Sequence, residues 1–353
     1  MTQTLSANKP AKSIQMGSTL VDNQTVYIIA EMACAHDGDY EKAKQLVDIA
    51  YDAKVNAVQF QLFHAPENMV RHHPIYGLLE KIEFSRDQWS DLVSYARAKK
   101  MDVFSCAYDM PSLEFSIQLK VDGIKFNSAD LNNFEMIECV AKSGIPFTLG
   151  TGASRMDEIG HAISVALNAG GDKFVLMHGM QSFPTSLALA NIRKIQSLSA
   201  TFGTLVGYAD HTDGEDPFSM DIDLLALGMG GAVFEKHYTI DRSLKGTDYQ
   251  AALNPAELIA YVQKMRKASI ALGSAMNKPF NADEIKYRTF QKKQIVAAHD
   301  LRQGTILTRK NIALLRTEDN GGLDASYLYE IIGKKLASNL NEQQLISINH
   351  FEK

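Results

Sequence analysis

Short apolar runs alternate with longer amphipathic stretches along the first 273 residues of the chain. Apolar runs of this length, bounded by turn residues, are typical of strands that are buried on both faces. Eight such runs occur, at residues 26–32, 57–63, 102–108, 123–129, 146–152, 173–179, 204–211 and 232–238. The pattern therefore predicts eight strands.

The stretches between the runs have the three- and four-residue spacing of helices. Within residues 40–53, one apolar stripe is formed by Ala43, Leu46, Val47 and Ala50. Ser85 is a predicted cap for a helix over residues 86–99, and Gly144 is a predicted end for a helix that begins at residue 133. Further helices are predicted from residue 111 and over 156–168, 186–198, 217–227 and 255–272.

Strands that alternate with helices indicate parallel βα units. Eight such units in about 250 residues match a closed (β/α)₈ barrel, and an open doubly wound sheet is the alternative because strand order cannot be read from sequence. We expect residues 1–273 to form the barrel with an N-terminal strand extension, and 274–289 to be a polar linker. Residues 290–353 carry short apolar pieces around turn residues, which predicts a small, mostly β domain that needs a partner surface.

Composition excludes several classes of protein. The chain has 353 residues, 45% of them hydrophobic and 22% charged, with a net charge of −5, so nothing suggests a nucleic-acid partner. Cys34, Cys106 and Cys139 lack CxxC spacing, which argues against a disulfide framework or a zinc knuckle. The first residues lack the apolar stretch of a signal peptide, and no run is long enough to span a membrane. We therefore expect a cytoplasmic protein.

Polar residues end almost every predicted strand. In a barrel, the groups that carry out chemistry lie at the carboxyl ends of the strands, so we expect these side chains to face one pocket. They are Glu31, His36, Gln59, Gln61, Cys106, Asp109, Lys125, Asn127, Ser128, Asp130, Thr151, His178, Gln181, Asp210, His211, Glu235, Lys236 and His237. Because side chains alternate along a strand, Glu235 and His237 share one face. A surface pair at a strand end is the alternative explanation for these two residues.

His211 and His237 end neighbouring predicted strands. Two imidazoles with open remaining positions suit a divalent ion that also holds water and substrate oxygens. The alternative is that one histidine is a hydrogen-bonded core residue and the other caps a loop.

Six segments resemble motifs of the sialic acid (N-acetylneuraminate) synthase family over nearly the whole chain. AEMACAHDGD (30–39) looks like the family's AEIGxNHxG, IKFNSADLNN (124–133) like KIxSxE/D, and MHGMQSFPT (177–185) like LHCxSxYPT. GYADHTDG (207–214) matches GYSDHTxG at all but one defined position, and EKHYTIDRSLKGTD (235–248) is similar to EKHFTLDRxxxGxD. The tail VAAHDLRQGTILTRKNI (296–312) resembles the antifreeze-like (SAF) domain that ends family members.

The resemblance implies a barrel that condenses phosphoenolpyruvate with an N-acylated amino sugar like N-acetylmannosamine. The product would be a nine-carbon 2-keto-3-deoxy acid of the nonulosonic (sialic-acid-like) type, and Mn²⁺ or Mg²⁺ would be required. By matching position, His211 and His237 would be the metal ligands, Glu31 the acid/base group for the attacking water, and Glu235 and Asp248 would hold the sugar or the metal's water. The residues implied in substrate binding are Lys125 and Ser128 at the phosphate, Gln181 and Phe183 at the sugar, and Asp130, Gln59 and Lys236.

The family also implies an assembly. Its SAF domain covers the barrel of the other subunit and sends an arginine into the sugar site, so a domain-swapped homodimer is expected. Arg316 is the matching residue here, although Thr317 follows it where the family has proline.

The chain departs from the family where anions would bind. A lysine and three hydroxyl residues of the family are replaced by Gln59, Cys106, Gly150 and Ala209. Two other functions therefore remain open: a metal-dependent aldolase or lyase on the same barrel that uses a donor without phosphate, such as pyruvate, and a catalytically silent sugar-binding barrel.

Overall fold

The computed structural model describes residues 9–274, 278–319 and 321–352, and the chain divides into two compact units of which the first ends at Ser274. The first unit contains a closed barrel of eight parallel strands in the order β10-β3-β4-β5-β6-β7-β8-β9. These strands are β3 (Tyr27–Glu31), β4 (Ala57–Leu62), β5 (Asp102–Ala107), β6 (Gly123–Phe126), β7 (Phe147–Gly150), β8 (Phe174–His178), β9 (Leu205–Asp210) and β10 (Val233–His237). The predicted barrel and its eight strands are thus confirmed, and the open sheet is excluded.

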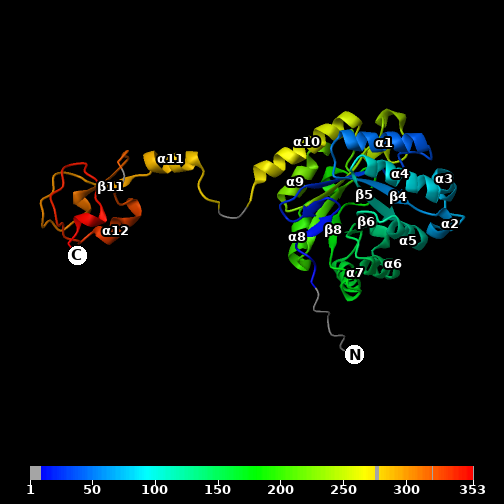
Figure 1. The fold of residues 1–353 in the computed structure, drawn as a ribbon, viewed down its shortest axis with the longest axis horizontal. Coiled ribbons are helices and arrows are strands. Elements are labelled where there is room, and N and C mark those ends of the chain that lie inside the picture. The colour runs from blue at the N-terminus through cyan, green and yellow to red at the C-terminus, as the bar shows by residue number, and fades with distance from the viewer. Residues whose placement is uncertain (1–8, 275–277, 320, 353) are drawn as a thin grey trace, which may run out of the picture. The chain divides into compact units, whose positions relative to one another are not determined.

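Helices follow the strands and surround the barrel (Figure 1). They are α1 (Tyr40–Asp52), α2 (Ala65–Asn68), α3 (Tyr76–Ile82), α4 (Arg86–Ala98), α5 (Met110–Gln118), α6 (Phe134–Ser143), α7 (Met156–Asn168), α8 (Lys194–Phe202), α9 (Ile222–Gly228) and α10 (Pro255–Leu272). The predicted caps hold: Ser85 accepts a hydrogen bond from the backbone N–H of Gln88 at the start of α4, and Gly144 ends α6 with φ +74°. Outward-facing strand residues and the apolar helix stripes form one large core.

A short N-terminal hairpin closes the bottom of the barrel. Strands β1 (Ile14–Met16) and β2 (Thr19–Val21) pair antiparallel, and Ile14, Met16 and Val21 pack with inward-facing apolar residues near the amino ends of the barrel strands. Gly17 makes the turn at φ +49°, and a Cβ there would lie 2.1 Å from the Asp102 carboxyl carbon, so only glycine fits. The lower half of the barrel interior is therefore apolar and filled.

Two predicted helices are wrong in their extent. Over residues 217–227, a 3₁₀ turn covers Pro217–Met220 and α9 begins only at Ile222. Residues 186–198 were expected to form one helix, but a short 3₁₀ turn covers Leu187–Leu189 and α8 begins only at Lys194. Asn191 between them has φ +48°, a left-handed conformation that no helix continues through. The connection therefore turns before α8 begins.

The second unit has its own small core. Strands β11 (Gln294–Ala297) and β12 (Ile312–Leu315) pair antiparallel, and isolated bridges and α12 (Leu328–Ile331) complete it around a separate apolar cluster. The predicted polar linker contains a helix, α11 (Ala282–Gln291), which begins at a capping box between Asn281 and Glu284. Among the described residues, no helix is both long and apolar enough to cross a membrane.

Candidate active site

A cavity of about 600 Å³ opens at the carboxyl ends of the barrel strands. Seven of the residues predicted for the site line it: Lys125, Asp130, Gln181, Phe183, His211, His237 and Asp248. Each comes from the end of a strand or from the loop that follows it, as the barrel fold requires. The closed sheet thus brings together segments more than 120 residues apart in the sequence.

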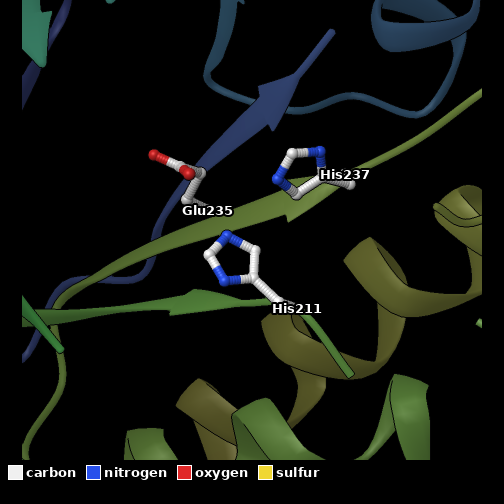
Figure 2. A group of neighbouring side chains, drawn as sticks. All are labelled: His211, Glu235 and His237. Atoms are coloured by element: carbon white, nitrogen blue, oxygen red, sulfur yellow. The ribbon is translucent and has the colours of Figure 1, made fainter. Parts of the chain in front are cut away.

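His211, Glu235 and His237 form a group that could hold a metal ion. Their ligand atoms all lie within 4.8 Å of one another, and all three residues are buried (Figure 2). β9 and β10 are neighbours in register, with Glu235 opposite Ala209, so that His237 comes beside His211. The predicted alternation of Glu235 and His237 on one face of the strand is therefore confirmed.

The hydrogen bonding of His211 leaves one ring nitrogen for a metal. Its Nδ1 lies 2.6 Å from the backbone carbonyl oxygen of Met180 and must donate there, so Nε2 keeps its lone pair. Burial lowers the pKa of both histidines, and the neighbouring His211 lowers that of His237 further, so both are neutral at pH 7. Two neutral imidazoles and a carboxylate fit a divalent cation.

Beneath the histidines, four polar side chains meet in the barrel interior. Lys125 Nζ lies 2.5 Å from Glu235 Oε1 and 3.4 Å from Glu31 Oε2. The amide of Gln59 donates to both carboxylates: to Glu235 Oε2 at 3.1 Å and, more closely, to Glu31 Oε2. Lys125 borders the cavity, whereas Glu31, Gln59 and Glu235 lie behind it with exposures of 0–1%. We name these four residues the charge cluster.

The electrostatics of the charge cluster bring the pKa of one carboxyl group, that of Glu31, close to 7. Burial raises the pKa of Glu31 to about 7, with a further increase from Glu235, while Lys125 and the hydrogen bond from Gln59 oppose the increase. Burial lowers the pKa of Lys125, but the two carboxylates outweigh it and keep the ammonium charged. A carboxyl group with a pKa near 7 can either give or take a proton at neutral pH, which suits a general acid or base.

Asp248 reaches the cavity from the loop after β10. Asp37 holds this loop: its carboxylate accepts hydrogen bonds from the backbone N–H and the hydroxyl of Thr247, at 2.9 and 2.8 Å. Gly246 passes so close that a Cβ would lie 2.7 Å from Asp37 Oδ2. Asp248 itself accepts a bond from the Cys34 N–H at 3.5 Å, and burial raises its pKa.

Ser128 lies at the side of the cavity, next to Gln181. Its hydroxyl accepts hydrogen bonds from the Gly152 N–H at 3.0 Å and from Gln181 Nε2 at 3.2 Å. Phe183 packs against the ring of His211, with centroids 4.2 Å apart. Ser128 is thus joined to the cavity through Gln181, which lines it, and Phe183 borders the two histidines.

Lys236 does not belong to the site, contrary to the prediction. It is 0% exposed and points away from the cavity, because its neighbours Glu235 and His237 occupy the inner face of β10. Its ammonium group pairs with Asp210, with Asp223 at 3.0 Å and with the Ser219 carbonyl at 2.5 Å. It therefore holds the barrel wall to the β9–α9 connection.

Several other polar strand ends also have structural contacts in place of a position in the cavity. Asp109 caps α5, His178 Nε2 donates to the Ala190 carbonyl at 2.8 Å, and the His36 ring packs on Phe84 and Trp89. Arg316 is exposed and lies in the second unit, just after β12. Its predicted role in the sugar site remains a prediction.

Sequence reasoning missed one wall of the cavity. This apolar wall lies on α3 and on the loops that flank α2 and α3, and it consists of Phe63, Met69, Ile75, Leu78, Leu79 and Ile82. Two signals could have revealed it: the connection from β4 to α4 is unusually long, and positions 75, 78, 79 and 82 have helical spacing.

The fold and the site together define a (β/α)₈ enzyme whose cation-binding and acid–base groups meet at the carboxyl ends of the strands. The model of the NeuB family matches residues 46–277, and that of the SAF domain matches residues 293–352. The chain therefore belongs to the NeuB family and carries a C-terminal SAF domain.

Relatives in this family are named as synthases. The N,N'-diacetyllegionaminic acid synthase of Legionella pneumophila is 30% identical over 94% of this chain and 96% of its own. The N-acetylneuraminate-9-phosphate synthase of Drosophila melanogaster is 30% identical, with 93% and 95% covered. A solved N-acetylneuraminic acid synthetase from Leptospira borgpetersenii, in complex with citrate, superposes with a TM-score of 0.73 at 31% identity, covering 80% of this chain and 98% of its own. The chain is thus an enzyme of the synthase type.

Proposed function

We propose that this enzyme makes a nonulosonic acid by condensing phosphoenolpyruvate with an N-acylated amino sugar and releasing phosphate. The observation that carries the proposal is the charge cluster directly beneath His211 and His237. It supplies a proton-transferring carboxyl group and a cation, and its Glu235 completes a metal-compatible triad with the two histidines, in a family whose relatives are named as sialic and legionaminic acid synthases.

Each group has a role in this reaction. The new carbon–carbon bond joins C3 of phosphoenolpyruvate to the aldehyde carbon of the sugar, and the aldehyde oxygen takes up a proton to become a hydroxyl. Water adds to C2 and loses a proton, and the bond from C2 to the phosphate oxygen breaks, which leaves the keto group and inorganic phosphate. Glu31, with its pKa near 7, takes the proton from the water. Lys125 and Asp248 line the cavity, where the lysine faces the anionic donor and the carboxylate orients the sugar hydroxyls; the Ser128 hydroxyl, bonded to the Gly152 N–H, is the further donor to the phosphate.

His211, His237 and Glu235 would hold a divalent ion, which when bound would polarise the aldehyde oxygen. Imidazole nitrogen favours Mn²⁺ over Mg²⁺ in this pair, because Mg²⁺ prefers an all-oxygen shell. Binding of the ion would also offset the excess of carboxylates in the charge cluster.

The test is turnover of phosphoenolpyruvate and N-acetylmannosamine with Mn²⁺, followed by mass spectrometry of the acid and by release of inorganic phosphate. Equal amounts of acid and phosphate, absent in Glu31→Gln, would support the proposal. If pyruvate is accepted and phosphoenolpyruvate yields no phosphate, the enzyme is an aldolase. If neither donor reacts and Mn²⁺ does not bind, the result would favour the alternative that the protein is a catalytically silent, sugar-binding barrel.

We also propose that the enzyme is a homodimer in which the second unit of one chain completes the barrel of its partner. The small core of that unit and the exposed Arg316 after β12 support this arrangement. Mixing Glu31→Gln with Arg316→Ala tests it, because only a swapped hybrid regains one intact site. Random mixing should restore roughly a quarter of wild-type activity, and no restoration would contradict the swap.

A further inference from the structure

The loop between β10 and α10 holds Asp248 in an unfavourable backbone conformation. Two of its residues, Lys245 and Asp248, have left-handed backbones with φ +51° and +61°. Residues other than glycine keep such a conformation where the surrounding contacts enforce it. The bond that the Asp248 side chain accepts from the Cys34 N–H is long, at 3.5 Å. The position of Asp248 therefore depends on contacts that its neighbours in the loop make.

Asp37 makes these contacts from the connection between β3 and α1. Its Oδ1 accepts both hydrogen bonds from Thr247, the residue directly before Asp248. Its Oδ2 pairs with the ammonium group of Lys42 in α1, and it also lies where a Cβ at Gly246 would come within 2.7 Å. The two oxygens of one side chain thus join the loop to a helix of the barrel.

The connection that carries Asp37 is tightly folded. Asp37 has a left-handed backbone with φ +50°, and its N–H donates to the Cys34 carbonyl at 2.9 Å. The buried ring of His36 accepts a bond from the Gly38 N–H at 3.1 Å through Nδ1. The Asp37 carboxylate is therefore a fixed point against which the neighbouring loop can be held.

The same connection bonds to both carboxylates that the proposed reaction uses. The Ala33 N–H donates to Glu31 Oε1 at 2.7 Å, and the next N–H along the chain, that of Cys34, donates to Asp248 Oδ2. Glu31 is held in addition by its place in β3, whereas Asp248 lies in a loop. Releasing that loop from Asp37 would therefore move Asp248 and leave Glu31 in place.

We propose that Asp37 is a positioning residue for the acceptor: its carboxylate holds Thr247, and through it Asp248, at the place where Asp248 meets the sugar hydroxyls. The inference rests on the proposed function, because it assigns Asp37 a part in acceptor binding at the same site. Its consequence is selective. Loss of Asp37 should weaken the binding of the amino sugar and leave that of the donor, at Lys125, unchanged.

The first test measures KM for N-acetylmannosamine and for phosphoenolpyruvate, with Mn²⁺, in Asp37→Ala. A hydrogen bond to a charged group is worth about tenfold or more in affinity, so KM for the sugar should rise at least about tenfold and KM for the donor less than about threefold. Asp37→Asn keeps one oxygen for Thr247 and should lie between Asp37→Ala and the wild type. Equal rises in the two KM values would overturn the inference.

Asp39→Asn is the matched control. Asp39 is exposed and caps α1 by accepting a bond from the Lys42 N–H at 3.1 Å. Asparagine caps a helix equally well, so this variant removes a carboxylate two residues from Asp37 without releasing the loop. Both KM values should stay as in the wild type.

A double-variant cycle separates positioning from general stabilisation of the fold. If Asp37 acts through Asp248, then Asp37→Ala should lower kcat/KM for the sugar by less than about twofold when Asp248→Asn is already present. A merely structural role would lower kcat/KM by the same factor in both backgrounds, and that result would overturn the inference.

Hydrogen–deuterium exchange tests the contact without turnover. Because Asp37 accepts the Thr247 N–H, a peptide covering residues 245–251 should exchange faster in Asp37→Ala, while peptides of α10 keep their rate. An unchanged rate for residues 245–251 would overturn the inference. Absence of turnover in the wild type would instead count against the proposed function, and the exchange rates would still decide whether Asp37 holds the loop.

Discussion

Lys236→Met is expected to destabilise the barrel without changing how the enzyme binds its donor. Lys236 is 0% exposed, and its ammonium group lies 5.2 Å from the ring centroid of Tyr261. Methionine is one heavy atom shorter but fills the space of the aliphatic part of the lysine side chain. The substitution removes only the charge and the donors. Asp210, Asp223 and the Ser219 carbonyl then lose their shared partner.

The magnitude follows from the burial of the two carboxylates. Removing one partner from a buried ion pair costs about 3–5 kcal/mol, because the other charge stays buried. Asp210 keeps bonds from the Tyr208 hydroxyl at 3.0 Å and from Thr212, so it is partly compensated. Asp223 keeps a bond from the Tyr261 hydroxyl at 3.1 Å, so it is less well compensated than Asp210. We therefore expect a loss of about 3 kcal/mol at pH 7.

The loss of unfolding free energy caused by Lys236→Met should become smaller as the pH falls. In the wild type, burial already raises the pKa of Asp223 to about 6 despite Lys236, and without the lysine it rises further. A carboxyl group whose folded pKa exceeds its unfolded value of 3.8 loses stability as the pH rises between these two values. At pH 5 the folded variant can keep a proton on Asp223, so it should lie closer to the wild type.

Urea unfolding followed by fluorescence measures this effect in the barrel alone. Trp89 is the only tryptophan of the chain, and it lies in α4 with 3% exposure. Lys264→Met is the matched control. Lys264 pairs with Asp221 at 2.5 Å, but both side chains are about one-third exposed, so the pair should contribute about 1 kcal/mol or less to the free energy of unfolding. A loss below about 1 kcal/mol for Lys236→Met, together with a raised KM for phosphoenolpyruvate, would mean that Lys236 contacts the donor and that the structural role is wrong.

Three further predictions concern the site. His211→Ala and His237→Ala should each lose most bound Mn²⁺ by elemental analysis while the far-UV circular dichroism stays unchanged, whereas the exposed His161→Ala should keep it; equal metal content in all three would contradict the triad. Because burial raises the pKa of Glu31 from 4.5 to about 7, the metal-free protein should lose stability as the pH rises across that range, and Glu31→Gln should remove this slope; a slope that persists in the variant would assign it to another group. Gln59→Lys adds a second cation within the charge cluster and should lower the KM for phosphoenolpyruvate about tenfold in a phosphate-release assay; an unchanged KM would show that the donor does not approach this residue.

The barrel could be predicted because each strand is buried on both faces, which leaves a continuous apolar run in the sequence. Alternation along β10 also placed Glu235 and His237 together correctly. The same alternation sends Lys236 to the opposite face, which contradicts the substrate-binding role that the family resemblance implied for it. The polar residues at the carboxyl ends of the strands could be recognised in the sequence. Which of them point into the cavity depends on the register between neighbouring strands, and only the closed sheet of the structure shows that register.

Five of the described helices differ from what the sequence pattern predicts: α8 and α9 in where they begin, and α2, α3 and α11 in that they were not expected. The left-handed Asn191 interrupts a stretch whose apolar spacing favours one helix. α2 and α3 have only four and seven residues, too few for a clear helical pattern in the sequence. Tertiary packing of their apolar side chains therefore decides where they form. α11 has a clear capping box, yet none of its described residues is buried, so its polar sequence was indistinguishable from a linker.

The substitutions at Gln59 and Gly150, where the family has lysine and serine, have different physical consequences. With both carboxylates ionised, the charge cluster carries two negative charges and one positive, a net −1, and Gln59 stabilises it only through neutral hydrogen bonds. Gly150, by contrast, leaves no room for the family's serine, because a Cβ there would lie 2.7 Å from both the backbone nitrogen and the hydroxyl of Ser128. Gly150→Ser would thus displace Ser128 from Gly152 and Gln181 rather than add a donor. Charge can be restored at Gln59 without rebuilding the wall, which makes that position the informative one for the donor.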